Sequence, residues 1–239
     1  MRKAGRWGDS LVRLVAPASC SLWPVTNAVR IWPSLARSAS MEHTEGIREF
    51  LGIQLRKALG PLTRGLARLK ITPNQITVAG TLLNLVAAGL VFADQLIAAG
   101  AVFIVAGCFD MLDGALARQS GMVTPFGAFL DSTLDRVSEG VVLAAIAYRF
   151  AEQGRSIDAS LVVVALLGSL LVSYTRARAE ALDLECKVGI MSRPERIVLI
   201  TVGLFFSILL PYVIYILVAL TLVTVAQRVL HTYRALRAR

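Results

Sequence analysis

Apolar residues dominate six long stretches of the chain, and short polar segments separate them. These stretches lie near residues 75–93, 96–118, 126–149, 157–178, 194–211 and 213–234. Each has the length that an α-helix needs to cross the hydrocarbon core of a bilayer, which is about 20 residues. The pattern therefore predicts an all-α, polytopic membrane protein with six transmembrane helices.

The segment before the first predicted span has a different, amphipathic pattern. Residues 47–69 place apolar side chains at helical spacing and interleave them with arginine and lysine. A helix of this kind lies in the interface of a membrane that contains anionic lipid. We expect Pro61 to kink or interrupt it. The chain is thus predicted to have a juxtamembrane amphipathic segment, residues 41–72, followed by a single membrane domain, residues 73–239.

Residues 1–40 form a basic extension that holds six arginines or lysines and a single acid, Asp9. The extension has no apolar run long enough to span a membrane, and it lacks the pattern of a secretory signal. Two origins fit its composition. It is either an organelle transit peptide or upstream translation from a mis-assigned start, with Met41 as the true first residue, and we favour the second.

The composition supports a membrane protein. The 239 residues are 56% hydrophobic, carry a net charge of +9 and have a mean hydropathy of +0.65. A soluble core does not have these values, whereas one membrane domain with basic flanks does. We expect membrane lipids, and no nucleic acid, among its partners. Cys20, Cys108 and Cys186 form no paired motif, so we expect free thiols rather than a disulfide framework or a zinc site.

Positive charge alternates between the connections of the predicted spans. One set of connections holds most of it, in Lys70, Arg118, Arg176, Arg178, Lys187, Arg193, Arg196, Arg228, Arg234, Arg237 and Arg239. The other set holds only Arg149 and Arg155. The positive-inside rule then places both termini and the aspartate-rich region on the cytoplasmic side of the cell inner membrane.

Four acids interrupt the apolar pattern between Phe109 and Arg136: Asp110, Asp113, Asp131 and Asp135. The first two are three residues apart and the last two are four apart, so each pair shares one face of a helix. Gly121 and Pro125 break the helix between the pairs. We therefore expect a hairpin of two membrane helices with an acidic seam near its turn.

Carboxylates at membrane depth need positive charge close by, because each ionised group there costs a few kcal/mol or more. No histidine lies near the four aspartates, and ligands that offer only oxygen favour Mg²⁺ or Mn²⁺. Four carboxylates exceed what one Mg²⁺ usually takes from a protein, so two ions are expected. Two other interpretations stay open: a proton or ion relay in an ion-coupled transporter, and a satisfied contact within a helix bundle.

The same stretch resembles the CDP-alcohol phosphotransferase family. The run DGALAR, then QSGMVTPF, then GAFLDSTLD fits the signature DGxxAR, eight residues, GxxxDxxxD, and Asp110 matches the aspartate that precedes it. The resemblance implies an integral-membrane enzyme, expected as a homodimer, in which an alcohol displaces CMP from a CDP-linked lipid. It also implies metal binding by Asp110, Asp113, Asp131 and Asp135, with Asp135 as the catalytic base.

Further residues are expected to bind the nucleotide. The resemblance implies this role for Gly114, Ala117, Arg118 and Gly127, and also for Pro73, Asn74 and Thr77 of a TPNxxT element at the start of the first span. Thr72 or Asn74 would cap that span. On the helix that follows the signature, we expect Arg136 and Glu139 to pair with each other.

Two arginine-rich segments, SYTRARAE and GIMSRPER, flank one predicted cytoplasmic loop. Guanidinium groups bind phosphate bidentately, although the positive-inside rule alone would also place arginines here. The segments resemble the family branch that uses inositol phosphate, the phosphatidylinositol-phosphate and archaetidylinositol-phosphate synthases. This implies acceptor-phosphate binding by Arg176, Arg178, Arg193, Arg196 and Arg228. Asp183 departs from the branch, since glycine is more usual there.

The expected function is therefore transfer of a phosphatidyl group from a CDP-lipid, such as CDP-diacylglycerol, to inositol phosphate. Two enzymatic alternatives remain: a phosphatidylglycerol-phosphate synthase type that uses glycerol 3-phosphate as the phosphorylated polyol, and a relative that uses CDP-inositol. An ion-coupled transporter is a more remote alternative.

Overall fold

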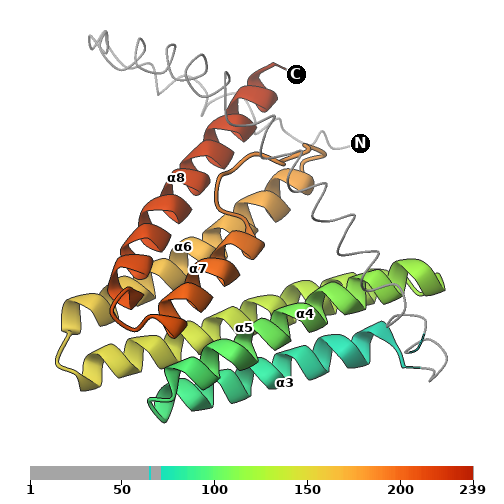
Figure 1. Ribbon diagram of the computed structural model, residues 1–239. Helices are drawn as coiled ribbons and strands as arrows, with labels where there is room; N and C mark the ends of the chain where they lie inside the picture. Colours follow the sequence, from blue (N-terminus) through green and yellow to red (C-terminus); the bar gives the residue numbers. More distant parts are fainter. Residues whose placement is uncertain (1–64, 66–70, 239) are drawn as a thin grey trace, which may run out of the picture. The chain divides into compact units, whose positions relative to one another are not determined.

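The computed structural model describes Gly65 and residues 71–238, and six helices lie within the second range (Figure 1). They are α3 Pro73–Phe92, α4 Leu96–Ser120, α5 Pro125–Glu152, α6 Ser156–Glu180, α7 Arg193–Phe205 and α8 Leu210–Arg237. This described part contains no β-strand, so the all-α prediction is confirmed. The predicted basic extension and most of the predicted juxtamembrane segment lie outside the described residues.

Four of these helices, α3, α4, α6 and α8, are long and apolar enough to cross a membrane. The other two differ for separate reasons. Helix α5 carries four charged residues, Asp131, Asp135, Arg136 and Glu139, before its apolar second half. Helix α7 has 13 residues, about 20 Å, and so falls short of a hydrocarbon core about 30 Å thick. The count of six spans therefore stays a prediction for α5 and α7.

The turn between α4 and α5 follows the predicted breaks. Gly121 ends α4 in the left-handed conformation, with φ of 66°, which glycine adopts without steric cost. Pro125 opens α5, where its missing N–H would have no helical partner. The Thr124 hydroxyl caps the new helix by accepting a hydrogen bond from the Gly127 backbone N–H at 3.0 Å. The two helices that carry the aspartates are thus joined by a short, well-capped turn.

The predicted end of α7 is wrong. The apolar pattern continues to residue 211, but the helix ends at Phe205 and α8 begins at Leu210. Pro211 explains the break, because it has no N–H to donate to the carbonyl of Ser207 and its ring would clash with that carbonyl. The four residues between the helices form a turn instead.

The helices pack as two connected groups, as Figure 1 shows. Helix α3 lies against α4 and α5, while α8 lies against α6 and α7; α5 contacts α6, and α4 contacts α7. The main apolar core includes Val91, Phe103, Ile146, Phe150, Leu204 and Leu217. Val91, Phe103, Ile146 and Phe150 come from the ends of α3, α4 and α5 that are farthest from the aspartates, and Leu204 and Leu217 come from α7 and α8. The other ends of α3, α4 and α5 are left to carry polar side chains.

Helices α6 and α8 approach closely at Gly168. A Cβ atom added there would collide with Oγ1 of Thr221 and would lie 3.0 Å from the Cβ atom of the same residue, tighter than most real Cβ contacts. Thr221 is fully buried, and its hydroxyl donates to the Leu217 carbonyl at 2.7 Å. Small residues at such contacts let membrane helices pack backbone to backbone.

Gly168→Ala is therefore expected to destabilise the protein, by about 1–3 kcal/mol, because the added methyl group overpacks the contact. Thermal unfolding of purified protein in detergent, followed by circular dichroism, would show a lower apparent Tm. Gly89→Ala is the matched control, since an added Cβ there meets no atom within 4 Å. An equal effect of both substitutions would contradict the assigned contact.

Candidate active site

The structure brings the four aspartates of the signature together. Asp110 and Asp113 come from the second half of α4, and Asp131 and Asp135 come from the first half of α5. Asp113 is buried and the other three are half-buried. The carboxylates lie close enough to repel one another electrostatically. Such a cluster requires positive charge within it.

The start of α3 braces this cluster from a third helix. The Thr77 hydroxyl donates to Oδ2 of Asp113 at 2.6 Å, and both side chains are buried. The Asn74 side-chain oxygen lies 3.0 Å from the position that a Cβ of Gly127 would take. Helix α3 begins at Pro73, just before these residues, and the predicted Thr72 is its N-cap. The TPNxxT element thus holds α3 against both aspartate-bearing helices.

The nucleotide-binding candidates on α4 continue the aspartate face. Asp110, Gly114 and Arg118 are spaced four residues apart, so they share one side of the helix. A Cβ added at Gly114 would lie 3.3 Å from Nη1 of Arg118, which shows that the guanidinium folds back over this glycine. Arg118 is exposed and Ala117 is half-buried. A phosphate that approaches the helix here would meet the Arg118 guanidinium, which lies where a side chain at Gly114 would otherwise project.

Arg193, the first residue of α7, supplies positive charge to the cluster. Its Nη2 atom lies 2.7 Å from Oδ2 of Asp110 and 2.7 Å from Oδ1 of Asp135. The guanidinium therefore bridges α4 and α5. Its Nε–H is buried and has no hydrogen-bond partner among the residues that the structure describes. Arg193 was predicted to bind the acceptor phosphate; in this structure its partners are carboxylates.

The donor atoms at this site fit a hard divalent cation. They are all carboxylate oxygens, and two of them already share one cationic group, the guanidinium of Arg193. Within the described part of the chain, however, no three acidic, histidine or cysteine side chains are gathered as closely as a bound metal ion would hold them.

Arg196 and Glu139 form a buried ion pair beside the cluster. Nε of Arg196 lies 2.7 Å from Oε1 of Glu139, and Nη2 lies 2.9 Å from Oε2. Ser169 of α6 donates to the same Oε1 at 2.6 Å. The predicted pairing of Glu139 with Arg136 is wrong, since Glu139 faces α7 while Arg136 donates to the Ser132 carbonyl of its own helix. The pair therefore ties α5, α6 and α7 together.

A cavity of about 260 Å³ opens next to these groups, between α5, α6, α7 and α8. Five arginines line it: Arg136, Arg176, Arg193, Arg196 and Arg228. Its carboxylates are Asp135, Glu139 and Glu180, so arginines outnumber acids in the lining. A cavity with this charge balance attracts anions, and guanidinium groups suit phosphate. Asp135 belongs both to the lining and to the aspartate cluster.

Arg176 and Arg228 were both predicted to bind the acceptor phosphate, and they reach the cavity from α6 and α8. Arg176 lies on α6, half-exposed, and its Nε is 2.8 Å from Oε1 of Glu180. Arg228 of α8 is buried and donates to two backbone carbonyls, those of Val188 at 3.0 Å and of Val172. Arg228 therefore fixes the loop before α7 against α6 while its charge faces the cavity.

Arg178, by contrast, is not part of the lining. It follows Arg176 by two residues, which turns its side chain about 200° around α6, and it is exposed. The structure therefore gives no support to the phosphate-binding role predicted for Arg178. Asp183 has φ of 56°, a left-handed conformation that explains why glycine is more usual there.

Sequence reasoning missed two positions that shape the site. Ser169 looks in the sequence like an ordinary small residue in an apolar span, yet its side chain is buried and donates a hydrogen bond to Glu139. Gly80 lets α3 approach α4, since a Cβ there would lie 3.1 Å from the Cβ of Phe109 and 3.5 Å from Oδ1 of Asp110. The available signal was the small or polar residue inside an apolar run, which marks close helix contacts.

Comparisons with known proteins identify similar sequences and structures. The family model described as CDP-alcohol phosphatidyltransferase matches residues 70–227. The archaetidylinositol phosphate synthase of Pyrococcus horikoshii is 38% identical over 177 residues, which cover 74% of this chain and 91% of that protein.

Two solved structures of the phosphatidylinositol phosphate synthase of Mycobacterium tuberculosis are also similar. The structure with CDP-DAG bound has a TM-score of 0.67 and 35% identity, and the match covers 72% of this chain and 91% of the other. The complex with manganese and citrate has a TM-score of 0.65 and 34% identity, with 72% and 87% covered.

Glu139→Gln is expected to destabilise the protein by about 3–5 kcal/mol, because it leaves the buried charge of Arg196 without a counter-ion. Glu180→Gln is the matched control: it removes one carboxylate from a half-exposed pair, which contributes about 0–1 kcal/mol. Apparent Tm values in detergent compare the two variants.

The double variant Glu139→Gln, Arg196→Met should recover much of the lost stability, because no unpaired charge is left buried. If Glu139→Gln unfolds at the same temperature as Glu180→Gln, the ion pair does not hold α5 and α7 together.

Proposed function

The chain belongs to the CDP-alcohol phosphatidyltransferase family, and on that premise we propose that it transfers a phosphatidyl group from a CDP-activated lipid to inositol phosphate and releases CMP. Membership makes it an integral-membrane transferase, which its four apolar helices also support. The donor is proposed as CDP-diacylglycerol or a similar lipid, since the similar synthase of Mycobacterium tuberculosis binds CDP-DAG.

One observation carries the choice of acceptor: the arginine-lined cavity shares Asp135 with the aspartate cluster. An acceptor that bears a phosphate could place it among the guanidinium groups and direct a hydroxyl toward Asp135. An unphosphorylated alcohol would leave the excess positive charge of the cavity unbalanced. Inositol phosphate and glycerol 3-phosphate both have a charged group and free hydroxyls, and the similarity to archaetidylinositol and phosphatidylinositol phosphate synthases favours inositol phosphate.

We propose that two divalent cations, Mg²⁺ or Mn²⁺, bind to Asp110, Asp113, Asp131 and Asp135. The similar synthase in complex with manganese supports a divalent metal. Bound there, the ions supply positive charge that stabilises the pyrophosphate oxygens and the departing CMP. Thr77 would keep Asp113 oriented through its hydrogen bond of 2.6 Å.

The reaction is a displacement at the phosphorus atom that the lipid carries. A hydroxyl oxygen of the acceptor forms a bond to that phosphorus, and the bond from phosphorus to the CMP oxygen breaks. Asp135 takes the proton of the attacking hydroxyl, which it could reach because it lines the acceptor cavity. CMP leaves as an anion beside Arg118, whose guanidinium lies over Gly114 on the same face of α4 as Asp110.

The remaining assignments follow from the same premise. Pro73, Asn74, Thr77, Gly114, Ala117 and Gly127 would surround the nucleotide, and Arg176, Arg193, Arg196 and Arg228 would surround the acceptor phosphate. We also propose six spans, cytoplasmic termini and a cytoplasmic active site, in keeping with the positive charge of the connections at this end. The homodimer stays an expectation from the family resemblance.

A panel of acceptors tests the proposed function. Purified protein is supplied with CDP-diacylglycerol and Mn²⁺, and CMP release is measured with inositol phosphate, glycerol 3-phosphate, inositol or no acceptor. Inositol phosphate is expected to give the highest kcat/KM. A preference for glycerol 3-phosphate would show that the proposed acceptor is wrong and the proposed enzyme class is right. Absence of metal-dependent CMP release with every acceptor would show that the proposed enzyme class is wrong.

Asp110→Asn, Asp113→Asn and Asp131→Asn are each expected to lower turnover by about a hundredfold or more, because a metal ligand with its charge is lost. Mn²⁺ binding, followed by electron paramagnetic resonance, should weaken in parallel. Glu152→Gln is the control, since it removes one carboxylate from the far end of α5. If a variant keeps normal activity at low metal concentration, the substituted aspartate is not a metal ligand.

Arg176→Ala is expected to raise the KM for inositol phosphate about tenfold to hundredfold and to change the KM for the CDP-lipid little. A guanidinium that binds a phosphate which does not react contributes mostly uniform binding, so its loss affects KM more than kcat. Arg178→Ala is a matched control from the same helix and should change neither value, because Arg178 lies outside the cavity. Equal effects of both variants on the KM for inositol phosphate would contradict this assignment and indicate that Arg178 also binds the acceptor.

A further inference from the structure

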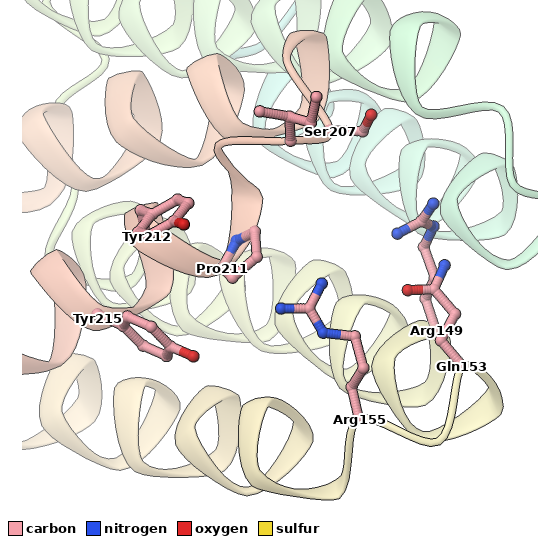
Figure 2. A pocket seen from close by; sticks show the side chains of 8 residues that line it. Arg149, Gln153, Arg155, Ser207, Pro211, Tyr212 and Tyr215 are labelled. Atoms are coloured by element: carbon pink, nitrogen blue, oxygen red, sulfur yellow. The ribbon is translucent and has the colours of Figure 1, made fainter.

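A second cavity lies far from the aspartates, between the end of α5, the start of α6 and the turn that joins α7 to α8 (Figure 2). Its volume is about 390 Å³, and its polar lining includes Arg149, Gln153, Arg155, Ser207, Tyr212 and Tyr215. Arg149 follows Asp135 by 14 residues on α5, which corresponds to about 21 Å along the helix. This cavity therefore lies near the membrane face opposite the aspartates.

The two arginines keep hydrogen-bonding capacity that faces this space. Arg149 contacts Asp94 through Nε at 2.6 Å, and Arg155 contacts Asp158 through Nε at 2.7 Å. Asp158 also accepts a hydrogen bond from the Tyr215 hydroxyl, so its charge is shared between two donors. Both carboxylates accept from Nε, and among the hydrogen bonds of the described residues neither arginine donates to its aspartate from a terminal nitrogen.

The terminal nitrogens differ between the two arginines. Those of Arg149 lie 3.1 Å from the Gln153 amide oxygen, in the amide orientation that satisfies both groups. Among the hydrogen bonds and ion pairs of the described residues, Arg155 donates through Nε alone. Its guanidinium carbon sits 4.9 Å from the centre of the Phe150 ring, and Figure 2 shows the group projecting toward Pro211. This stacking holds the guanidinium in place with its end toward the cavity.

The rest of the lining is amphipathic. Tyr212 is 61% exposed and Ile208 is 82% exposed, so an occupant would meet apolar surface as well as charge. Exposed tyrosines of this kind are typical of the interface between a bilayer and water, where lipid headgroups lie. A free inorganic ion would use the guanidinium groups and leave this apolar surface uncovered. A phospholipid would use both, with its phosphate at the arginines and its chains along Ile208.

We propose that this cavity binds the phosphate of an anionic phospholipid from the leaflet opposite the aspartate cluster. The proposal does not depend on the transferase reaction. It assigns a role to Arg149 and Arg155, the two arginines that the positive-inside pattern leaves on the less basic side of the membrane.

The experiment uses the full-length protein in detergent and native mass spectrometry. Phosphatidylglycerol and phosphatidylcholine are added separately, and lipid retention is compared for wild type, the double variant Arg149→Gln, Arg155→Gln, and Ser207→Trp. The third protein keeps both arginines and fills the cavity, so it separates occupancy from loss of ion pairs. Arg234→Gln is the control for loss of charge, because Arg234 is exposed at the opposite end of α8. A second arm adds inorganic phosphate as competitor.

Wild type and Arg234→Gln are expected to retain phosphatidylglycerol about tenfold better than both cavity variants, since charge-assisted contacts to phosphate are lost or blocked. Phosphatidylcholine should show no such difference, and inorganic phosphate should not displace the lipid. Equal retention by all four proteins would overturn the site. Displacement of the lipid by inorganic phosphate would show that the cavity binds a small anion and not specifically a phospholipid.

Discussion

Four carboxylates between apolar helices repel one another, and only positive charge can hold them in one place. In this structure a guanidinium does so: Arg193 contacts Asp110 of α4 and Asp135 of α5 at the same distance, 2.7 Å. Three residues later, Arg196 forms the buried ion pair with Glu139. Both arginines lie in the first turn of α7, so this short helix is held in place by charge at one end and by the apolar core, through Leu204, at the other.

The placement of the core makes this charge balance possible. Val91, Phe103, Ile146 and Phe150 fill the ends of the helices that lie away from the aspartates, so packing there does not compete with polar groups at the other end. Thr77 of α3 then adds a hydrogen bond to Asp113. The fold separates one region that stabilises it from another in which polar groups can face a ligand.

Local rules predict much of this arrangement. The spacing of the aspartates and the break at Gly121 and Pro125 involve residues within one or two turns of each other, and the structure has them as expected. The pairing of Glu139 with Arg196 joins residues 57 apart in the sequence, and no periodicity reports such a contact. The side of α6 that faces the cavity likewise depends on where α8 packs, which is why Arg176 and Arg178 looked equivalent in the sequence.

Arg193 shows how the two descriptions of the site fit together. The family resemblance implies that it binds the acceptor phosphate, whereas the structure places it on Asp110 and Asp135. One guanidinium cannot satisfy both sets of partners fully. Because the two carboxylates are also the expected metal ligands, a cation that neutralises them removes the charge that holds Arg193. Arg193 also lines the arginine-rich cavity, and its buried Nε has no hydrogen-bond partner among the described residues. The two roles of Arg193 therefore compete, because the terminal nitrogen that an acceptor phosphate would use is the one that contacts both carboxylates.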